Sequence, residues 1–286
     1  MYEGIDKQLI PLIKNFIEKV RLEHLPQLAN IIPADAVLRI LEQEAVVIYF
    51  PEGLNSADSE EKPKNNGFLF DAIDFAGEKK HFVYINSAQT IDKQIFTAAH
   101  ELGHLWQLNV YISGRAPDIE YNEEDLMSRF AAEFLMPEKE FIDYASEFGS
   151  DYLKDGKISL FSMLCIISKL MNIFLCPYKA VVRRLYELDF ISHKAIDFLI
   201  PTKQEDKLVL MDKIKEINIE FGYERLNNPD GKKWMSGLAD MLDLAEKEGC
   251  VSKAKIAYLR RTFSLPENLQ NKRFSASIPL GEKGDK

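Results

Sequence analysis

Thr97-Ala-Ala-His-Glu-Leu-Gly-His104 is the stretch on which the interpretation of this sequence depends. It contains the pattern His-Glu-x-x-His, with His100 and His104 four residues apart. On a helix, residues at this spacing lie about 40° apart around the axis, so both imidazoles can reach one metal ion. Glu101 is then placed to accept a proton from a water that the metal activates. The spacing predicts a hydrolytic zinc site.

The residues around this motif favour a helix. Apolar side chains recur at the spacing of one helix face, at Ile95, Ala99, Leu102 and Trp106. The two histidines lie on a neighbouring face, and Thr90 or Asp92 is expected to cap the helix. A single histidine here would favour a structural role. Two histidines at this spacing with the intervening glutamate favour metal binding.

A catalytic zinc needs three protein ligands and one position open to water. Gln107 and Val110 occupy the positions of the glycine and third histidine of the extended motif, so the third ligand must come from elsewhere. A second, carboxylate-rich helix is expected over Glu123–Met136, ended by Pro137. The third ligand is expected on this helix.

Helical phase selects one carboxylate of the second helix. Glu124 shares a face with small and apolar side chains, whereas Glu133 lies on the opposite side. We therefore expect Glu124 to be buried and to bind the metal, because a buried carboxylate needs a partner. Its alternative role is to stabilise an acidic helix N-terminus. The alternative ligands are Asp118, Glu120 and Asp125.

The composition limits the class of protein. With 286 residues, of which 46% are hydrophobic, the chain can bury a substantial core. A net charge of -9 argues against a surface that coats nucleic acids. The three cysteines are widely spaced and form no Cys-x-x-Cys pair, which suits a reducing compartment. No secretory signal is visible at the start, so we expect a cytoplasmic protein.

One apolar stretch, residues 158–176, is nearly long enough to span a bilayer. Lys169 lies near its middle, and a central lysine costs about 2.5 to 3.5 kcal/mol on insertion. A buried helix of a globular protein is therefore favoured over a membrane anchor, which stays the alternative.

The remaining pattern indicates an α+β protein. Helices are expected over residues 5–21 and 34–43, a strand over 46–50, an exposed loop over 55–66, and two antiparallel strands over 67–73 and 80–85. Further helices are expected over residues 159–172, 177–188, 205–221, 232–247 and 252–263. This arrangement gives a small sheet of about three strands, followed by an all-helical C-terminal region.

Three segments together resemble the ImmA/IrrE metallopeptidases of bacteria and their mobile elements. They are Ile85-Asn86, Phe96 to His104, and the run from Glu124 through Phe130-Ala131-Ala132 to Leu135-Met136-Pro137. The resemblance covers roughly residues 34–137 and continues more weakly to about 192. Met127 stands where the family usually has alanine, and Ser128 stands where Asn or Asp is common.

This resemblance implies a zincin-like domain that uses zinc to cleave a helix-turn-helix repressor, relieving repression of mobile-element or stress genes. The expected parts are residues 1–145 as the zinc metallopeptidase domain, 146–200 as a helical, helix-turn-helix-like region, and 201–286 as a C-terminal helical region with a disordered tail from about residue 275. Zinc would be held by His100, His104 and Glu124, with Glu101 as the general base.

Some roles stay open at this point. The residue that stabilises the oxyanion is one of three unranked candidates: Tyr111, Tyr121 and His81. Lys179, Arg183 and Arg184 are candidates for reading DNA, although helix packing with solvated charges is favoured. The alternative function is a non-catalytic regulator or toxin-antitoxin component that keeps its zinc site and acts by binding protein or DNA.

Overall fold

The computed structural model describes residues 5–24, 34, 36–52, 66–73, 77–152 and 158–265. These residues form helices around a small mixed sheet, which confirms the expected α+β class. The chain divides into two compact units, residues 1–236 and 237–286. The expected boundaries at 145 and 200 both fall inside the first unit, and the expected division into three parts stays a prediction. The expected exposed loop and C-terminal tail lie almost entirely outside the described residues.

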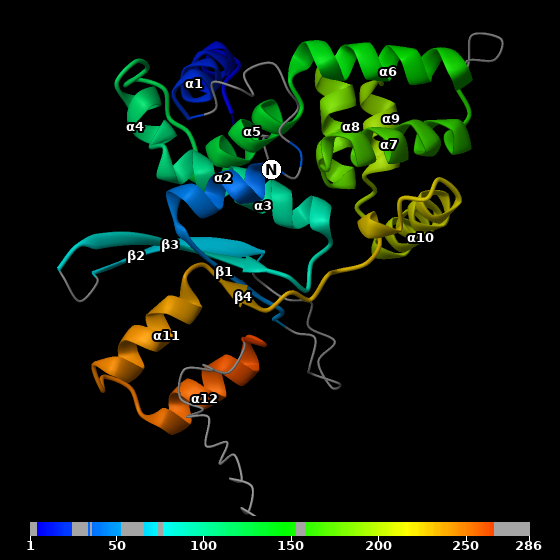
Figure 1. Cartoon of the computed structure of the whole chain (residues 1–286). Coiled ribbons are helices and arrows are strands. Elements are labelled where there is room, and N and C mark those ends of the chain that lie inside the picture. Colours follow the sequence, from blue (N-terminus) through cyan, green and yellow to red (C-terminus); the bar gives the residue numbers. More distant parts are fainter. Residues whose placement is uncertain are drawn as a thin grey trace, which may run out of the picture. The chain divides into compact units, whose positions relative to one another are not determined.

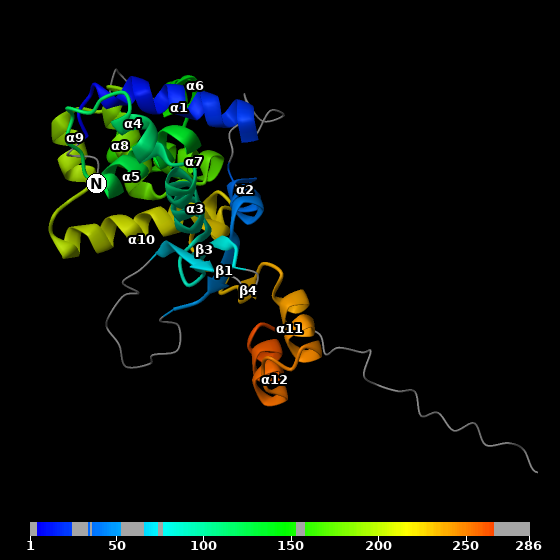
Figure 2. The same cartoon turned by 90° about the vertical axis from the view of Figure 1, so that its left-hand side faces the viewer.

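Two helices precede the sheet, α1 (Leu9–His24) and α2 (Ala36–Glu44). The apolar residues of α1 recur every three or four positions, so they lie on one face and are buried together. That face packs on α4 (Leu108–Ser113) and α5 (Glu123–Leu135). In both views, α4 and α5 lie between α1 and the sheet (Figures 1 and 2).

Within the residues that the structure describes, the sheet has four strands in the order β2-β3-β1-β4. The strands are β1 (Val46–Phe50), β2 (Gly67–Ile73), β3 (Lys79–Asn86) and β4 (Trp234–Met235). β2 pairs with β3 in antiparallel fashion, as expected, whereas β1 runs parallel to β3. Side chains alternate between the two faces, and the face with Val47, Val83 and Ile85 is buried.

The fourth strand corrects the expectation of three strands and of a helix over residues 232–247. Trp234 and Met235 pair antiparallel with Tyr49 and Ile48, and the Trp234 ring lies 5.8 Å from that of Tyr49. This long-range pairing outweighs local helix propensity, and the helix α11 begins only at Leu238. The C-terminal region is therefore helical except for one short strand that completes the sheet.

The remaining helices of the first unit follow the sheet strands β2 and β3. They are α3 (Ile91–Leu105), α6 (Glu138–Tyr152), α7 (Leu160–Phe174), α8 (Tyr178–Glu187), α9 (His193–Leu199), α10 (Gln204–Glu220) and the 3-10 turn η2 (Glu224–Leu226). Figure 1 shows α3 between the sheet and α5. The sequence did not predict α4, α6 or α9 as separate helices.

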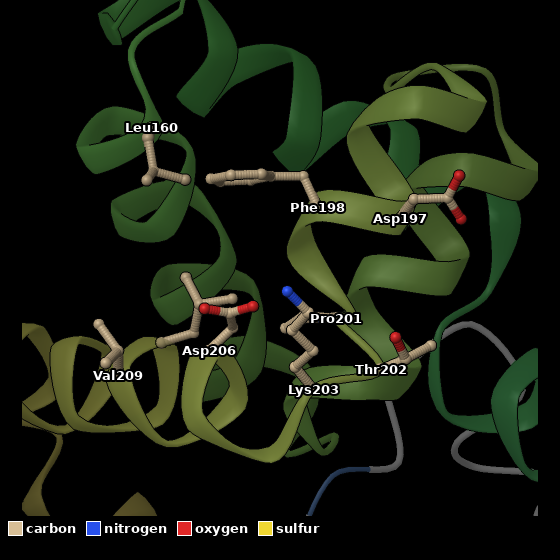
Figure 3. Close-up of a pocket in the computed structure, with 9 residues that line it drawn as sticks. Leu160, Asp197, Phe198, Pro201, Thr202, Lys203, Asp206 and Val209 are labelled. Atoms are coloured by element: carbon tan, nitrogen blue, oxygen red, sulfur yellow. The ribbon is translucent and has the colours of Figure 1, made fainter.

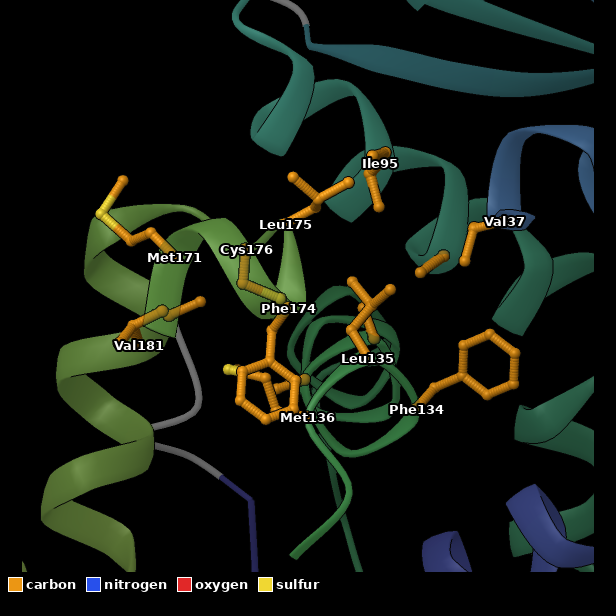
Figure 4. Close-up of a cluster of buried hydrophobic side chains, with 14 of the residues drawn as sticks. Val37, Ile95, Phe134, Leu135, Met136, Met171, Phe174, Leu175, Cys176 and Val181 are labelled. Carbon is orange, nitrogen blue, oxygen red and sulfur yellow. The ribbon is translucent and has the colours of Figure 1, made fainter. Parts of the chain in front are cut away.

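The core continues from α3 and α5 into the connection between α7 and α8. Figure 4 shows Leu175 of this connection pointing towards Ile95 of α3, with Leu135 and Met136 nearby. All four side chains are fully buried or nearly so. The helices after residue 146 therefore share one hydrophobic core with the helix that carries the histidine motif.

Among the described residues, no single helix is both long and apolar enough to cross a membrane. α7 and α8 reach that length only as a pair, and they bend by 106° where they meet. The Lys169 ammonium group lies 4.8 Å from the ring centre of Phe148 and 5.0 Å from that of Tyr152. These aromatic rings of α6 accommodate the charge in the middle of the apolar helix.

The described part of the second unit, residues 237–265, contains two helices, α11 (Leu238–Lys247) and α12 (Lys253–Thr262). Ser252 caps α12 by accepting a hydrogen bond from the backbone N–H of Lys255. Arg260 of α12 donates a hydrogen bond to Asp243 of α11, and both helices bury apolar residues. The unit is thus a helical hairpin closed by an ion pair.

Candidate metal centre

The motif helix α3 packs closely on two neighbours. A Cβ atom at Gly103 would lie 2.8 Å from the sulfur of Met127 and 3.0 Å from the ring of Phe130 in α5. A Cβ atom at Gly67 in β2 would lie 2.6 Å from the Cγ2 atom of Thr97. Glycine at these two positions lets α3 approach both α5 and β2. Met127, where the family usually has alanine, is therefore accommodated by the absence of a side chain at position 103.

The structure brings the three expected ligands together. Glu124 Oε2 lies 3.1 Å from His100 Nε2, and Glu124 Oε1 lies 3.6 Å from His104 Nε2. One donor atom from each residue lies within 4.8 Å of the others. Two imidazoles and one carboxylate are a donor set that zinc binds in hydrolytic sites, with a further position left for water. The residues present therefore fit a metal ion.

Glu124 is not buried, which corrects the argument from helical phase. Its side chain is 74% exposed, whereas Glu133, expected on the outer side, is 4% exposed as a residue. The reason is that α5 is surrounded by other helices from Leu126 onwards, so no face points to solvent. Glu124 lies before that point, in the first turn after the capping residue Asn122. The position in the first turn explains why this carboxylate is exposed, while the face that it shares with Met127 and Ser128 contacts α3 as the phase predicts.

Glu101 lies beside the cluster and is buried, with 5% of its surface exposed. Burial raises the pKa of its carboxyl group to about 7, and the charge of Glu124 adds to this shift. A hydrogen bond to the backbone of Leu69 in β2 acts in the opposite direction. A carboxyl group with a pKa near neutrality can both accept and release a proton, which is what a general base and acid must do.

The histidine rings are also mostly buried. The His100 side chain is 14% exposed and that of His104 is 18% exposed. The pKa of His100 is lowered to about 4, chiefly by burial and also by the charge of His104, while Glu124 acts against both. The imidazole of His100 is therefore neutral at neutral pH, as metal binding requires.

The other candidate ligands do not join the cluster. The metal-binding group found among the described residues consists of His100, His104 and Glu124. Asp118 and Glu120 are exposed residues of the segment between α4 and α5, and Asp125 is half-buried in the first turn of α5. The structure therefore favours Glu124 over these three alternatives.

The oxyanion candidates are engaged in other contacts. The ring of Tyr111 packs 4.9 Å from that of Phe16. The hydroxyl group of Tyr121 donates a hydrogen bond to the backbone carbonyl of Asn109 at 3.1 Å. His81 Nδ1 lies 2.6 Å from Asp71 Oδ1, across β2 and β3. These contacts do not rank the three candidates.

Arg184 is not available to read DNA. Only 1% of its surface is exposed, and its guanidinium group donates two hydrogen bonds to Glu133, of 2.8 and 2.7 Å. The expectation that its charge is solvated or faces DNA is therefore wrong, because α8 directs it against α5. Lys179 of the same helix is exposed.

A surface pocket of about 400 Å³ lies apart from the cluster, between α7, α9 and α10. Figure 3 shows Phe198 projecting towards Leu160 across it, with Asp206 and Val209 on α10. None of the candidate ligands lines this pocket. It is a feature of the helical part and not of the candidate metal centre.

The small mixed sheet, the motif helix and the carboxylate from α5 together define a metallopeptidase-like domain. Residues 54–186 match the family model Peptidase M78, described as the IrrE N-terminal-like domain, which supports the resemblance of this part of the chain to the ImmA/IrrE metallopeptidases. The match is to a peptidase family, and the family implies a bound metal. No curated protein matches the chain.

Sequence reasoning missed the groups that surround the ligands. Ser128 Oγ lies 3.3 Å from His100 Nδ1, although the sequence presented Ser128 only as a departure from the family pattern. Asn109 lies on α4, which was not predicted, and donates a hydrogen bond to Glu123. Gln107 has a left-handed backbone conformation, with φ of 58°, and separates α3 from α4. Non-glycine residues adopt this conformation rarely, so the sequence did not indicate the turn.

Proposed function

We propose that this chain is a zinc-dependent endopeptidase that acts in the cytoplasm and cleaves a protein substrate. The observation that carries the proposal is the cluster of His100, His104 and Glu124 with the buried Glu101 beside it. The match of residues 54–186 to a peptidase family model supports the same reaction class. Zinc fits the donor set, since two imidazoles and one carboxylate leave a position for water.

The residues of the site would have distinct roles in catalysis. A zinc ion bound by the three ligands supplies activation of water and polarisation of the peptide carbonyl. Glu101 accepts the proton of the attacking water and passes it to the leaving amine, because its carboxyl group is buried and has a pKa near neutrality. The Leu69 backbone of β2 holds this carboxyl group in place.

The proposed substrate is a helix-turn-helix transcriptional repressor, whose cleavage would relieve repression of mobile-element or stress genes. This part of the proposal rests on the resemblance to the ImmA/IrrE family that the match of residues 54–186 supports. The alternative of a non-catalytic regulator is less well supported, because structural zinc sites use four protein ligands and the cluster contains three.

The test is coexpression with a helix-turn-helix repressor, chosen from the genes beside the one that encodes this chain, using wild-type protein and Glu101→Gln. We expect the wild type to cleave the repressor and Glu101→Gln to cleave at least about 100-fold more slowly, because the general base is lost. Zinc content, measured in parallel, should be equal in both proteins. Cleavage by Glu101→Gln at the wild-type rate would show that the hydrolytic mechanism is wrong.

A further inference from the structure

Each histidine of the cluster turns its second ring nitrogen away from Glu124 and towards another polar side chain. His104 Nδ1 lies 3.3 Å from Glu123 Oε1, and His100 Nδ1 lies 3.3 Å from Ser128 Oγ. The two Nε2 atoms face the Glu124 carboxylate at 3.6 and 3.1 Å. Both rings thus present Nε2 to the candidate metal position and keep Nδ1 for a contact outside it.

Glu123 is held from a second direction. Asn109 of α4 donates a hydrogen bond from Nδ2 to Glu123 Oε1 at 3.1 Å. α4 follows α3 directly, through the left-handed turn at Gln107, so Asn109 is returned to the first turn of α5. A continuous line of polar contacts therefore runs from Asn109 on α4 through Glu123 on α5 to His104 on α3.

We propose that Glu123, braced by Asn109, is the positioning residue of His104 and thereby sets the affinity of the centre for its metal ion. The proposal rests on the metal site of the proposed function and adds a residue to it. A carboxylate beside the Nδ1–H group of a ligating histidine fixes the tautomer and the ring orientation, and it makes Nε2 a better ligand.

The two histidines are then supported unequally. His104 has a carboxylate beside Nδ1, whereas His100 has only the hydroxyl group of Ser128. A carboxylate orients a protonated ring nitrogen more strongly than a neutral hydroxyl group, because the contact is charge-assisted. Loss of the Glu123 carboxylate should therefore affect metal binding more than loss of the Ser128 hydroxyl group.

The other role open to Glu123 is stabilisation of the α5 N-terminus, where three acidic residues occupy the first turn. Asp125 lies in that same turn but outside the metal-binding group, so it provides a matched control. A role at the helix terminus affects the stability of the protein without metal. A positioning role affects the affinity for the metal.

The experiment is competition for zinc between a chromogenic chelator and full-length wild type, Glu123→Ala, Glu123→Gln or Asp125→Asn. We expect Glu123→Ala to weaken zinc affinity by about 10- to 100-fold, and Asp125→Asn to bind zinc as the wild type does. Glu123→Gln should lie in between, because its amide oxygen can still accept a hydrogen bond from Nδ1–H. Thermal unfolding of the metal-free proteins checks that all four are folded.

Two results would overturn the positioning role: a Glu123→Ala protein that binds zinc as tightly as the wild type, or an Asp125→Asn protein weakened by the same factor. Cobalt gives a second readout. The absorption bands of bound Co²⁺ should shift in Glu123→Ala and stay unchanged in Asp125→Asn. A wild-type chain that binds neither zinc nor cobalt would overturn the proposed metal site itself. A wild type that binds zinc and a Glu123→Ala protein that binds it equally well would overturn only the positioning role of Glu123.

Discussion

At the scale of single residues, two carboxylates of the same helix have opposite roles. Glu124, in the exposed first turn of α5, faces the histidines, whereas Glu133, nine positions later, is enclosed between α5 and α8. Glu133 accepts hydrogen bonds from Arg184 and Arg129. Glu124 is thus placed for metal binding, and Glu133 holds two helices together.

The Glu133 ion pairs should give stability that depends on pH. Burial raises the pKa of the Glu133 carboxyl group, but the charges and hydrogen bonds of Arg184 and Arg129 lower it by a larger amount. The pKa therefore lies below its ordinary value. A group with a lowered pKa in the folded state stabilises the fold above its unfolded pKa, near 4.3. This contribution is lost as the pH falls through the folded value.

We therefore expect Glu133→Gln to lower the free energy of unfolding at pH 7 by about 3 to 5 kcal/mol, because the buried Arg184 loses its closest carboxylate and keeps only the longer ion pair with Glu187. The difference from the wild type should shrink below about pH 4.3. Urea unfolding followed by circular dichroism at several pH values measures both effects. Glu138→Gln is the control, since its pair with Lys14 is exposed and should contribute at most about 1 kcal/mol.

A difference between wild type and Glu133→Gln that stays constant from pH 7 to the acid limit would contradict the lowered pKa. A loss no larger than that of Glu138→Gln would contradict the role of the buried pair.

At the scale of the elements, the position of the motif helix depends on β2. A Cβ atom at Gly67 would lie 2.5 Å from the backbone oxygen of Tyr84 and 2.6 Å from the Cγ2 atom of Thr97. Either β2 or its neighbours β3 and α3 must then shift, because the backbone oxygen of Tyr84 cannot move aside by a change of rotamer. We expect Gly67→Ala to lower the free energy of unfolding by roughly 1 to 3 kcal/mol.

Gly149→Ala is the matched control for this substitution. Gly149 lies within α6, and a Cβ atom there would meet nothing within 4 Å. Alanine should therefore stabilise the protein by up to about 1 kcal/mol through helix propensity. Thermal or urea unfolding of the two variants compares them directly. Equal effects of the two substitutions would show that β2 and α3 do not pack as closely as described.

Much of this element structure could be predicted from local patterns. The strand expected over residues 46–50 forms with these bounds, and the pair expected over 67–73 and 80–85 forms over 67–73 and 79–86, because propensity and pairing agree. The apolar stripe of α1 is buried as its periodicity requires. The exception is β4, where Trp234 and Met235 extend because they pair with a strand nearly 190 residues earlier in the sequence.

The candidate site was only partly predictable for a related reason. His100, Glu101 and His104 follow from spacing along one helix, which is local information. Glu124 was selected by phase, and it reaches the histidines although it is exposed and not buried as that argument assumed. The contacts of Asn109 and Ser128 depend on how α4 and α5 pack around α3, which spacing in the sequence does not determine.

At the scale of the whole molecule, the first compact unit joins the metal centre to the helices that follow it. The segment after η2 returns to the sheet, where Ser87 Oγ donates a hydrogen bond to the carbonyl of Lys232 and the N–H of Ser236 donates to the carbonyl of Val47. The chain from residue 187 onwards lies outside the family match, yet part of it completes the sheet that supports α3. We infer that the metal centre depends on residues well beyond the matched segment.

The central claim is that His100, His104 and Glu124 together hold one zinc ion. Native mass spectrometry of the full-length chain after addition of zinc tests it most directly, with wild type, Glu101→Gln, His100→Ala, His104→Ala and Glu124→Gln compared under the same conditions. We predict one zinc ion per chain for the wild type and Glu101→Gln, and greatly reduced occupancy for the three ligand variants, because each loses one of three protein donors. Full zinc occupancy in all three ligand variants, or none in the folded wild type, would contradict the account.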